Sequence, residues 1–332
     1  MNVLLPMAGF GTRLRPLTWS KPKPLVPVAG QPVLGHVLDM FDDLPDVKDV
    51  VFIVGYLGDQ VQAYVQRAYP RLTARYVEQR EMLGQSHALW LAREFLHGPV
   101  LLLFVDTLIE TDLRRAIGNG QAGVAWVKAV DDPRRFGVAE VDEGGWVRRL
   151  VEKPADRKNN LVVVGCYFLP QGEDLAQAIE EQMKRNLHLN GEFFLVEALN
   201  LMLERGLKMR VEPVEVWEDC GKPDALLHTN RYLLDHGREN STSASAARPG
   251  VVVVPPVFVD PEARVERAVI GPYASLAAGC VVEDSVVRDS VVDEEAEISG
   301  AVLSGSLVGR QARIRGGFRS MIVGDSSEVG FE

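Results

Sequence analysis

Acidic residues are missing from the first part of a chain that is otherwise acidic. The 332 residues include 46 Asp and Glu against 36 Lys and Arg, which gives a formal net charge of −10. No acidic residue occurs between Met1 and Asp39, whereas Arg13, Lys21 and Lys23 all fall in that stretch. Because salt screens charges beyond about 8 Å, these local cations outweigh distant carboxylates. The opening stretch therefore predicts a site for a polyphosphate.

Cysteines and long apolar runs are also scarce. Cys166, Cys220 and Cys280 are the three cysteines and lie far apart, which suits neither a disulfide framework nor a zinc site. No apolar run approaches the roughly 20 residues that span a bilayer, and the start lacks a signal-peptide pattern. The acidic balance disfavours nucleic-acid and membrane surfaces, since both require clustered Lys and Arg. We expect a cytoplasmic protein with neither a nucleic-acid partner nor a membrane partner.

The chain divides into regions of different pattern. Up to residue 237, apolar runs such as Val100–Val105 alternate with amphipathic stretches such as 174–186, and residues 137–151 predict a hairpin. This alternation predicts an α/β fold with an open sheet of mostly parallel strands. Residues 238–250 are small and polar, which is typical of a flexible linker. The predicted first domain is therefore 1–237, followed by the linker 238–250.

Residues 251–332 have an apolar residue at every sixth position over much of their length. The spacing is clearest at Ile270, Leu276 and Val282, and it recurs as far as Val329. A six-residue period is typical of the left-handed parallel β-helix, in which each hexad forms one flat face and directs its apolar residue inward. An ordinary small β-sandwich is the alternative. The predicted third region is therefore a β-helix.

The glycine-containing loop at residues 9–13 follows a short apolar strand, Val3–Leu5. A P-loop is excluded because Gly11 is followed by Thr and Arg, not by Lys and then Ser or Thr. A Rossmann fingerprint is excluded because Leu14 stands where the third glycine is required. Glycines let backbone N–H groups approach phosphate oxygens, and the Arg of this loop adds charge together with Lys23.

Several segments together resemble the sugar-1-phosphate nucleotidylyltransferases. The segment Pro6–Arg13, followed by Pro22–Val28, is similar to the signature of that family. Further segments that resemble family elements are Gln79–Gly84, Val105–Thr107, Phe136–Val138, Glu152–Pro154, Gly191–Glu192 and Glu218–Pro223. The resemblance covers roughly residues 1–236. It implies an open, Rossmann-like mixed sheet of the nucleotide-diphospho-sugar transferase type, to which a β-helix is commonly appended.

The resemblance also implies a reaction and the residues that perform it. Such an enzyme transfers a nucleoside monophosphate from a nucleoside triphosphate to a sugar-1-phosphate and releases pyrophosphate. Arg13 would hold the β- and γ-phosphates, Lys23 would reach the triphosphate near the reacting centre, and Lys153 would hold the sugar phosphate. Asp106 and Asp219 would together bind Mg²⁺, which prefers carboxylate and phosphate oxygens. These five are the predicted catalytic residues.

The same resemblance assigns the binding residues. The predicted nucleotide-binding residues are Ala8, Gly9, Gly11, Thr12, Arg13, Lys23, Gln79 and Gly84. The predicted sugar-phosphate-binding residues are Gly137, Glu152, Lys153, Gly165 and Glu192. Glu192 has a structural alternative, since an acid in the first turn of a helix is favourable in itself. The amide of Gln79 can pair with the imide edge of thymine or uracil, which favours dTTP or UTP; glucose-1-phosphate is the default sugar of the resemblance.

Other functions stay open from the sequence. A mannose-1-phosphate guanylyltransferase is the alternative within the family. Acyl transfer at the β-helix is disfavoured because the last histidine, His236, precedes the repeats. A non-catalytic, nucleotide-binding regulatory relative would have lost some of the five predicted catalytic residues, and all five are present. The β-helix is better explained as an assembly module, so we expect a homo-oligomer.

Overall fold

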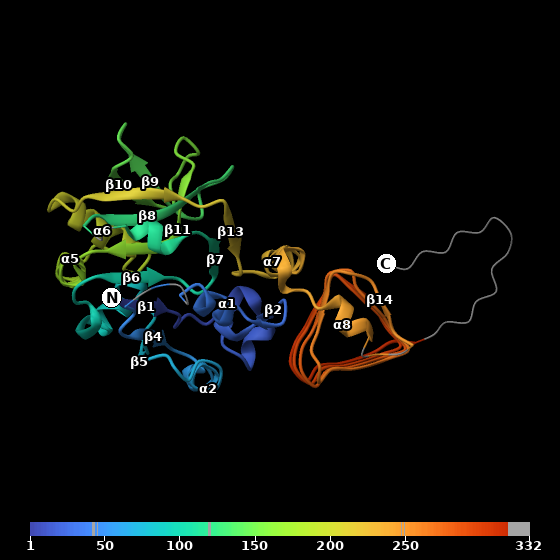
Figure 1. Ribbon diagram of the computed structural model, residues 1–332. Helices are drawn as coiled ribbons and strands as arrows, with labels where there is room; N and C mark the ends of the chain where they lie inside the picture. Colours follow the sequence, from blue (N-terminus) through green and yellow to red (C-terminus); the bar gives the residue numbers. More distant parts are fainter. Residues whose placement is uncertain (42–43, 45, 119–120, 247, 249, 318–332) are drawn as a thin grey trace. The chain divides into compact units, whose positions relative to one another are not determined.

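The computed structural model describes residues 1–317 except 42, 43, 45, 119, 120, 247 and 249. Contacts divide the chain, drawn in Figure 1, into two compact units. The first unit contains Met1–Pro27 and Gln31–Thr229; the second contains Val28–Gly30 and the chain from Asn230 onward. The predicted hexad at Val329 lies outside the described residues. Over the described part of the chain, no helix is long and apolar enough to cross a lipid bilayer.

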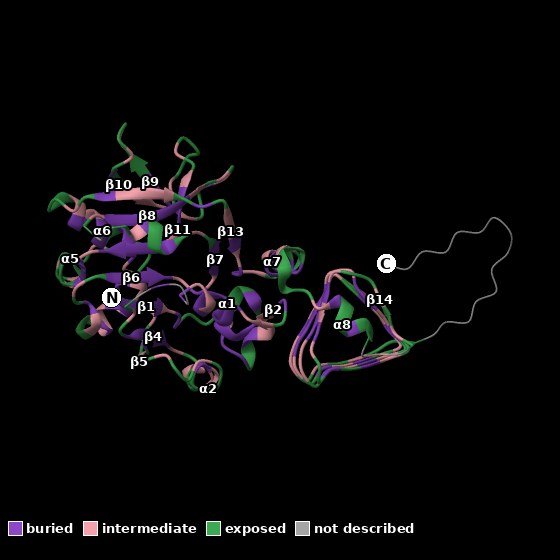
Figure 2. Cartoon of the chain, in the orientation of Figure 1, coloured by how far each residue is buried: buried purple, intermediate pink, exposed green. Residues whose placement is uncertain are grey.

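Four parallel strands form one half of the sheet of the first unit. They lie in the order β6 (Val100–Leu103), β1 (Asn2–Pro6), β4 (Val50–Val54) and β5 (Ala74–Glu78). The first three are buried almost throughout, as Figure 2 shows, because both faces of the sheet are covered. Since the four strands are parallel, the loops that follow them leave the sheet at one edge. Open α/β sheets bind their ligands at this edge.

The other half of the sheet is largely antiparallel. β11 (Leu161–Leu169) runs antiparallel to β6 and to β8 (Gly123–Ala129), and β12 (Met209–Pro213) extends β8. β9 (Gly137–Val141) and β10 (Val147–Glu152) form the predicted hairpin. The mixed sheet implied by the family resemblance is confirmed. The mostly parallel sheet expected from the alternation is wrong, because apolar patterns identify strands but not their direction.

A separate two-stranded ribbon joins distant parts of the sequence. β7 (Thr107–Glu110) and β13 (Val216–Asp219) are antiparallel, and their register pairs Thr107 with Asp219. Asp106 directly precedes β7. The ribbon therefore brings the two predicted metal-binding residues close together.

The helices of the first unit pack apolar residues against the sheet. α5 (Gly172–Lys184) buries Leu175, Ala178 and Ile179, a spacing that marks one helix face. These residues share a core with α3 (Gln85–Leu91) and α6 (Leu195–Glu204). Other elements are α1 (Val33–Asp39), α2 (Gly58–Ala68), α4 (Leu113–Ile117), α7 (Pro223–Leu233), the short 3₁₀ turns η1 (Thr12–Leu14), η2 (Leu17–Trp19), η3 (Lys23–Leu25) and η4 (Arg93–Phe95), and the ribbon β2 (Pro27–Val28) with β3 (Gln31–Pro32).

Three four-stranded parallel sheets make up most of the second unit. The first contains β14 (Val252–Val253), β17 (Val269–Ile270), β20 (Val286–Arg288) and β23 (Val302–Ser304). The second contains β15 (Val257–Val259), β18 (Ala274–Leu276), β21 (Val291–Val292) and β24 (Leu307–Val308). The third contains β16 (Arg264–Glu266), β19 (Val281–Glu283), β22 (Glu297–Ser299) and β25 (Arg313–Arg315). Consecutive strands belong to different sheets, so the predicted β-helix is confirmed and the β-sandwich alternative is wrong.

The residues of the six-residue repeat stack in register inside this β-helix. The register pairs are Ile270 with Val287, Leu276 with Val292, and Val282 with Ile298. All of them are at most 1% exposed. The register advances by 16 or 17 residues, slightly less than three full hexads. Because each coil is slightly shorter than three hexads, the six-residue spacing of apolar residues is interrupted at intervals along the sequence.

The stretch 238–250 contains a short helix, α8 (Ser241–Ala246), and does not fit a flexible linker over those residues. Ala244 is buried in the apolar core of the second unit. The Oγ of Ser241 accepts a hydrogen bond from the N–H of Val257 at 3.0 Å. Small side chains predict a linker by composition, but they also let a helix lie close to a strand.

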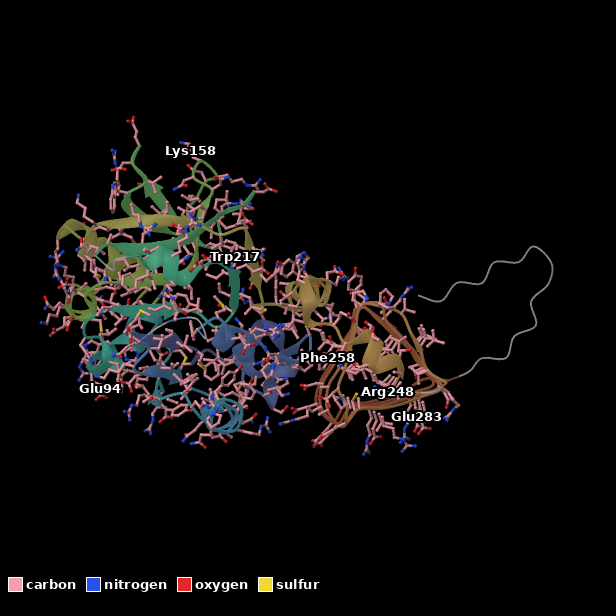
Figure 3. All side chains as sticks on the ribbon, in the orientation of Figure 1. Glu94, Lys158, Trp217, Arg248, Phe258 and Glu283 are labelled. Atoms are coloured by element: carbon pink, nitrogen blue, oxygen red, sulfur yellow. The ribbon has the colours of Figure 1, made fainter. Side chains whose placement is uncertain are left out.

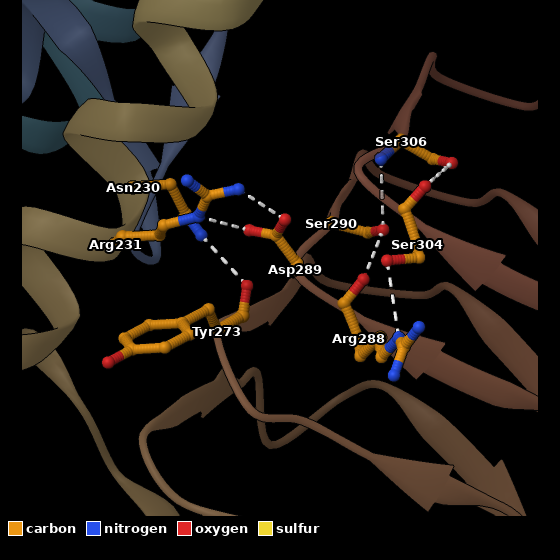
Figure 4. A network of polar contacts seen from close by, with 8 residues as sticks. All are labelled: Asn230, Arg231, Tyr273, Arg288, Asp289, Ser290, Ser304 and Ser306. Carbon is orange, nitrogen blue, oxygen red and sulfur yellow. Dashed lines mark hydrogen bonds and ion pairs between the residues drawn. The ribbon is translucent and has the colours of Figure 1, made fainter.

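A polar cluster fixes the end of α7 within the second unit, as Figure 4 shows. Asn230 is fully buried. Its Oδ1 accepts from the N–H of Ala29 at 2.9 Å, and its Nδ2 donates to the carbonyl of Tyr273 at 3.1 Å. Arg231, beside it, forms a two-point ion pair with Asp289. The residue range Val28–Gly30 is therefore tied to the second unit by a buried hydrogen bond.

Candidate active site

Three cavities of the first unit share lining residues and include the predicted site residues; each is named after a lining residue or segment. The Gln79 cavity, of about 320 Å³, is lined by Pro6, Met7, Ala8, Gly9, Phe10, Thr12, Gln79, Met82, Gly84, Gln85, Ala88, Phe104 and Glu192. The loop cavity, of about 430 Å³, is lined by Pro6, Met7, Gly9, Phe10, Gly11, Thr12, Arg13, Lys23, Pro24, Phe104, Val105, Asp106, Glu192 and Gly221. The Lys153 cavity, of about 390 Å³, is lined by Arg13, Gln85, Phe104, Asp106, Thr107, Arg135, Phe136, Gly137, Glu152, Lys153, Val163, Val164, Gly165, Tyr167, Phe194, Val196, Trp217 and Asp219.

The predicted nucleotide-binding residues and the predicted sugar-phosphate-binding residues mostly line different cavities. Every predicted nucleotide-binding residue lines the Gln79 cavity or the loop cavity. Of the predicted sugar-phosphate-binding residues, all but Glu192 line the Lys153 cavity. Glu192 instead lines the other two. Arg13 and Asp106 line both the loop cavity and the Lys153 cavity, so they mark the junction between them.

The loop after β1 approaches the Lys23 segment closely because of Gly11. Gly11 has a φ of +61°, and a Cβ there would lie 2.9 Å from the Cβ of Lys23 and 3.1 Å from Cγ2 of Thr18. The Oγ1 of Thr18 donates to the carbonyl of Gly11 at 2.9 Å. A Cβ on Gly9, by contrast, would meet no protein atom within 4 Å. The loop is therefore fixed on one side and leaves space for a ligand on the other.

Lys23 and Asp106 form an ion pair at this junction. The Nζ of Lys23 lies 2.5 Å from Oδ2 of Asp106. Burial raises the pKa of Asp106, but Lys23 and, more weakly, Arg13 outweigh burial and hold the pKa below its ordinary value. Asp106 is therefore ionised at neutral pH and can bind a cation.

Asp219 is held close to Asp106 by the β7–β13 ribbon. The N–H of Cys220 donates to the carbonyl of Asp106 at 3.0 Å. The Oδ1 of Asp219 accepts from the N–H of Gly221 at 2.6 Å. A Cβ on Gly221 would lie 3.1 Å from Nη2 of Arg13, so the guanidinium lies beside this turn. Two carboxylates and a cation thus converge from three separate segments.

The donor set suits Mg²⁺. Among the residues that the structure describes, no group of three or more His, Cys, Asp or Glu could hold a metal ion. Mg²⁺ is commonly bound by only one or two carboxylates and completes its shell with phosphate oxygens and water. Asp106 and Asp219 each use one oxygen in the bonds above, and an ionised carboxylate accepts several. The pair therefore fits a metal ion that arrives with a phosphorylated ligand.

The β9–β10 hairpin positions Glu152 and Lys153. The register pairs Glu152 with Gly137, where a Cβ would lie 3.3 Å from Oε2 of Glu152. The N–H of Lys153 donates to the carbonyl of Phe136 at 2.9 Å. The Nζ of Lys153 lies 3.9 Å from Oε1 of Glu152 and 4.4 Å from the centre of the Phe194 ring. The cavity thus offers an acceptor and a cation side by side.

Trp217 lines the Lys153 cavity, although it is not among the residues predicted for the site. It belongs to β13 (Figure 3), and its ring meets Phe136 edge-on with the centres 5.0 Å apart. Its buried Nε1 has no hydrogen-bond partner among the described residues. Trp217 and Asp219 are two positions apart on one strand, so they share a face. That spacing was the signal available in the sequence.

His87, another residue without a predicted role, orients Gln79. The side chain of Gln79 donates from Nε2 to the carbonyl of Gly84 at 3.1 Å and lies 3.1 Å from Nδ1 of His87. Burial lowers the pKa of His87, with Glu81 opposing, so Nδ1 can accept as part of a neutral ring. Within the described chain, no group donates to Oε1 of Gln79, which therefore remains available to a ligand.

Gly84 completes this wall of the Gln79 cavity. It has a φ of +101°, and a Cβ there would lie 2.6 Å from both N and O of Phe193. The N–H of Phe193 donates to the carbonyl of Leu83 at 2.8 Å. Only glycine fits this close approach, which fixes the backbone beside the amide of Gln79.

Comparison with known proteins assigns the chain to a family. The profile described as "Nucleotidyl transferase" matches residues 2–236. The chain is 30% identical over 338 residues to the glucose-1-phosphate thymidylyltransferase of Streptomyces griseus, which covers 95% of this chain and 93% of that protein. It is also 30% identical over 359 residues to the enzyme of the same name from Streptomyces antibioticus, with 99% of both chains covered. The chain belongs to the nucleotidyl transferase family.

The resemblance to sugar-1-phosphate nucleotidylyltransferases is thereby confirmed, and the chain is a nucleotidyltransferase enzyme. The bifunctional protein GlmU of Methanocaldococcus jannaschii is 32% identical over 235 residues, which cover 71% of this chain and 55% of that protein. Among solved structures, a UDP-glucose pyrophosphorylase complexed with UDP-glucose has the same fold, with a TM-score of 0.61 at 21% identity over 71% of this chain and 98% of that one. A putative glucose-1-phosphate thymidylyltransferase from Bacillus anthracis gives 0.60 at 25% identity over 70% and 94%.

Proposed function

We propose that this enzyme transfers a nucleoside monophosphate from a nucleoside triphosphate to a sugar-1-phosphate. The supporting observation is that the Gln79, loop and Lys153 cavities adjoin, with Arg13 and Asp106 at the junction of the last two. A nucleotide with its base in the Gln79 cavity and its phosphates in the loop cavity would present its α-phosphate near that junction. A sugar phosphate held by Lys153 would reach it from the other side.

The reaction needs position and charge neutralisation. An oxygen of the sugar phosphate bonds to the α-phosphorus while the bond to the bridging oxygen of pyrophosphate breaks. Two unit charges 4 Å apart repel by about 4 kcal/mol at an effective dielectric constant of 20. Arg13 and Lys23 offset this repulsion on the triphosphate side and Lys153 on the sugar side. No covalent nucleophile is required, because oriented anions react once their charge is compensated.

We propose Mg²⁺ as the cofactor, held by Asp106 and Asp219. The ribbon that pairs Thr107 with Asp219 supports this, because it joins two carboxylates that are far apart in sequence. When bound, the ion would neutralise charge shared by the α-phosphate and the sugar phosphate. Lys23, which lies 2.5 Å from Asp106, orients that carboxylate from the loop side.

The favoured substrates are dTTP or UTP with glucose-1-phosphate. The free Oε1 of Gln79 suits a base whose imide N–H donates, as in thymine and uracil. The names of the Streptomyces relatives and of the solved pyrophosphorylase point to the same substrate class. Mannose-1-phosphate guanylyltransferase remains the alternative. We also propose a cytoplasmic location, which suits the three unpaired cysteines.

A substrate matrix tests the proposal. Pyrophosphate release is measured for the purified full chain with Mg²⁺, each common nucleoside triphosphate and a set of sugar-1-phosphates. We expect the highest kcat/KM with dTTP or UTP and glucose-1-phosphate. A preference for GTP with mannose-1-phosphate would support the alternative. No release with any pair would contradict the enzymatic proposal and favour a nucleotide-binding regulator.

Glu152→Gln should weaken sugar-phosphate binding and remove a pH dependence. Burial raises the pKa of Glu152 above the ordinary 4.5, Lys153 opposes this, and Glu192 and Glu197 reinforce it. As the pH falls toward that raised pKa, the ionised acceptor is lost, so the wild-type KM for the sugar phosphate should rise. The variant should show a KM raised about tenfold, without that dependence. Steady-state kinetics over a pH series measures both.

Thermal unfolding provides the control for Glu152→Gln. Because folding raises the pKa of Glu152, its ionised form costs stability above the unfolded-state pKa. The variant should therefore be at least as stable as the wild type at neutral pH. A destabilised variant would show that its kinetic defect comes from misfolding. A wild-type KM that does not change on acidification would contradict the role of the ionised carboxylate.

We further propose that the enzyme is a homo-oligomer that associates through the β-helix. Val252, Val269, Val286 and Val302 pair in register on the outer side of one sheet. Val252 is 57% exposed and Val302 is 78% exposed. The outer side of the third sheet instead has ion pairs such as that between Arg264 and Glu283, which suit contact with water. A ladder of valines is complementary to a second copy of itself.

Val286→Lys combined with Val302→Lys should shift the enzyme toward monomer. Charges facing each other across an apolar interface lose hydration without gaining partners. Light scattering during gel filtration measures the mass. Ser299→Lys, on the outer side of the third sheet, is the matched control and should leave the mass unchanged. A wild-type monomer, or an unchanged mass in the double variant, would contradict this interface.

A further inference from the structure

Two adjacent arginines before the β9–β10 hairpin have different surroundings. Arg134 is locked onto Asp132, with Nε 2.8 Å from Oδ1 and Nη2 2.6 Å from Oδ2. Arg157 binds the same carboxylate at 2.9 Å. Arg135 makes no hydrogen bond or ion pair with any residue that the structure describes. It is Arg135, and not Arg134, that lines the Lys153 cavity.

The backbone holds Arg135 next to the proposed sugar-phosphate site. The carbonyl of Phe136 accepts from the N–H of Lys153 at 2.9 Å, and Gly137 pairs with Glu152 in the hairpin. The residues that follow Arg135 are thus bonded to the residues that form the acceptor and the cation of the cavity. Arg135 therefore starts from a fixed backbone position beside Lys153.

The negative charges of the cavity and of a bound phosphate are not balanced by Lys153 alone. Its lining carboxylates are Asp106, Glu152 and Asp219. Lys153 is partly committed, since its Nζ lies 3.9 Å from Oε1 of Glu152. A phosphate monoester brings a further charge of about −1.5 to −2 at neutral pH. Arg13 also lines the cavity but is proposed to hold the triphosphate, and the shared ammonium of Lys153 alone does not balance the dianion. Arg135 lines the same cavity and has no ion-pair partner among the described residues.

We propose that Arg135 binds the phosphate of the sugar-1-phosphate together with Lys153. This inference rests on the proposed function and adds a substrate-binding residue to it. The planar guanidinium can hold two phosphate oxygens at once, whereas the ammonium of Lys153 acts as a point charge. With two oxygens held in this way, the third would be free to face the junction, which Arg13 and Asp106 line. Arg135 thereby binds and orients the attacking phosphate.

Arg135→Gln tests this directly. We expect the KM for the sugar-1-phosphate to rise about tenfold or more, because a charge-assisted hydrogen bond is lost. The KM for the nucleoside triphosphate should stay within about twofold, because that substrate is proposed to occupy the other cavities. Arg135→Lys should restore part of the binding, since it keeps the charge and loses the fork. The melting temperature should change little, because Arg135 has no hydrogen bond or ion pair to lose among the described residues.

Arg134→Gln is the matched control, since it removes the same charge one residue away. Its KM for the sugar-1-phosphate should stay within about twofold of the wild type, because Arg134 is occupied by Asp132. An equal rise of this KM in both variants would show that any loss of positive charge near the cavity has the same effect, and it would overturn the proposal. An unchanged KM in Arg135→Gln would also overturn it, as would a rise confined to the nucleoside triphosphate.

Calorimetric titration separates this inference from the proposed function. Wild-type protein should bind glucose-1-phosphate more tightly than Arg135→Gln, and the difference should shrink as KCl is raised, because salt screens the contact. Methyl glucoside, which lacks the phosphate, should not distinguish the two proteins. Equal binding of glucose-1-phosphate by both would refute the role of Arg135 even if turnover is normal. Absence of turnover with a clear difference in binding would instead refute the proposed reaction alone.

Discussion

Asp106→Asn is expected to lower kcat for pyrophosphate release by about a hundredfold or more, the usual cost of removing one electrostatic contact to a transition state. The amide keeps the shape of the side chain but removes the charge that faces Lys23 at 2.5 Å and the proposed Mg²⁺. The concentration of Mg²⁺ needed for half-maximal rate should rise as well. Stopped-assay kinetics with saturating substrates over a Mg²⁺ series measure both quantities.

Two comparisons make the Asp106→Asn result specific. Asp219→Asn should have a similar effect, and the double variant should lose less than the product of the two, because both carboxylates hold one ion. Asp112→Asn is the matched control, since Asp112 caps α4 by accepting from the N–H of Arg115 at 2.8 Å and lines none of the three cavities. A near-normal rate for Asp106→Asn would show that the metal assignment is wrong.

Lys23→Met is expected to reduce kcat/KM for the nucleoside triphosphate by about a hundredfold to a thousandfold. The variant loses the ammonium proposed to neutralise the triphosphate and leaves Asp106 without its ion-pair partner. Lys48→Met removes an exposed lysine that lines none of the three cavities, so it serves as the control for a general loss of positive charge and should have a much smaller effect. Equal losses in the two variants would contradict a specific role of Lys23.

The same substitution changes a pKa in a known direction. Lys23 is the main cause that holds the pKa of Asp106 below the ordinary 3.8, so the pKa should rise when Lys23 is removed. In the wild type, the stability from this pair is present above the unfolded-state pKa and is lost as the pH falls through the folded-state pKa. Lys23→Met should therefore melt at a lower temperature at pH 7, with a smaller difference in strong acid. A melting temperature at pH 7 equal to that of the wild type would contradict this coupling.

The loop after β1 and the β-helix could be predicted because their signals are local. The glycines and cations of residues 9–23 lie within one short stretch. The apolar residues of the β-helix recur every six positions, so their period can be taken directly from the sequence. The buried strands β4 and β6 were visible as apolar runs. In each case the residues that determine the structure are neighbours in sequence, so their spacing alone identifies the element.

The pairing of strands that are far apart in sequence could not be predicted from the spacing of residues alone. The register that sets Asp219 against Thr107 joins strands more than a hundred residues apart, and only the family resemblance suggested it. The direction of a strand cannot be predicted from its apolar pattern either. The pattern of β11 would be the same whether it ran parallel or antiparallel to β6. Helix α8 was missed because the same small residues that predict a linker also permit tight packing.

Which single side chains of the site are free to bind a ligand could not be predicted from the sequence either. Arg134 and Arg135 are indistinguishable by type and position in the sequence. Their difference comes from Asp132, whose carboxylate is occupied by Arg134 and Arg157. Which of the two adjacent cations remains available to a ligand is decided by a contact that only the fold reveals.

The most direct test of the whole account is product analysis with glucose-1-phosphate whose phosphate carries heavy oxygen. Incubation with dTTP or UTP and Mg²⁺ should give a nucleoside diphosphate sugar and pyrophosphate in equal amounts. Mass spectrometry should find all of the label in the sugar nucleotide and none in the pyrophosphate, because the sugar phosphate oxygen attacks the α-phosphorus. Label in the pyrophosphate, or release of nucleoside monophosphate without any sugar nucleotide, would contradict nucleotidyl transfer between the two cavities.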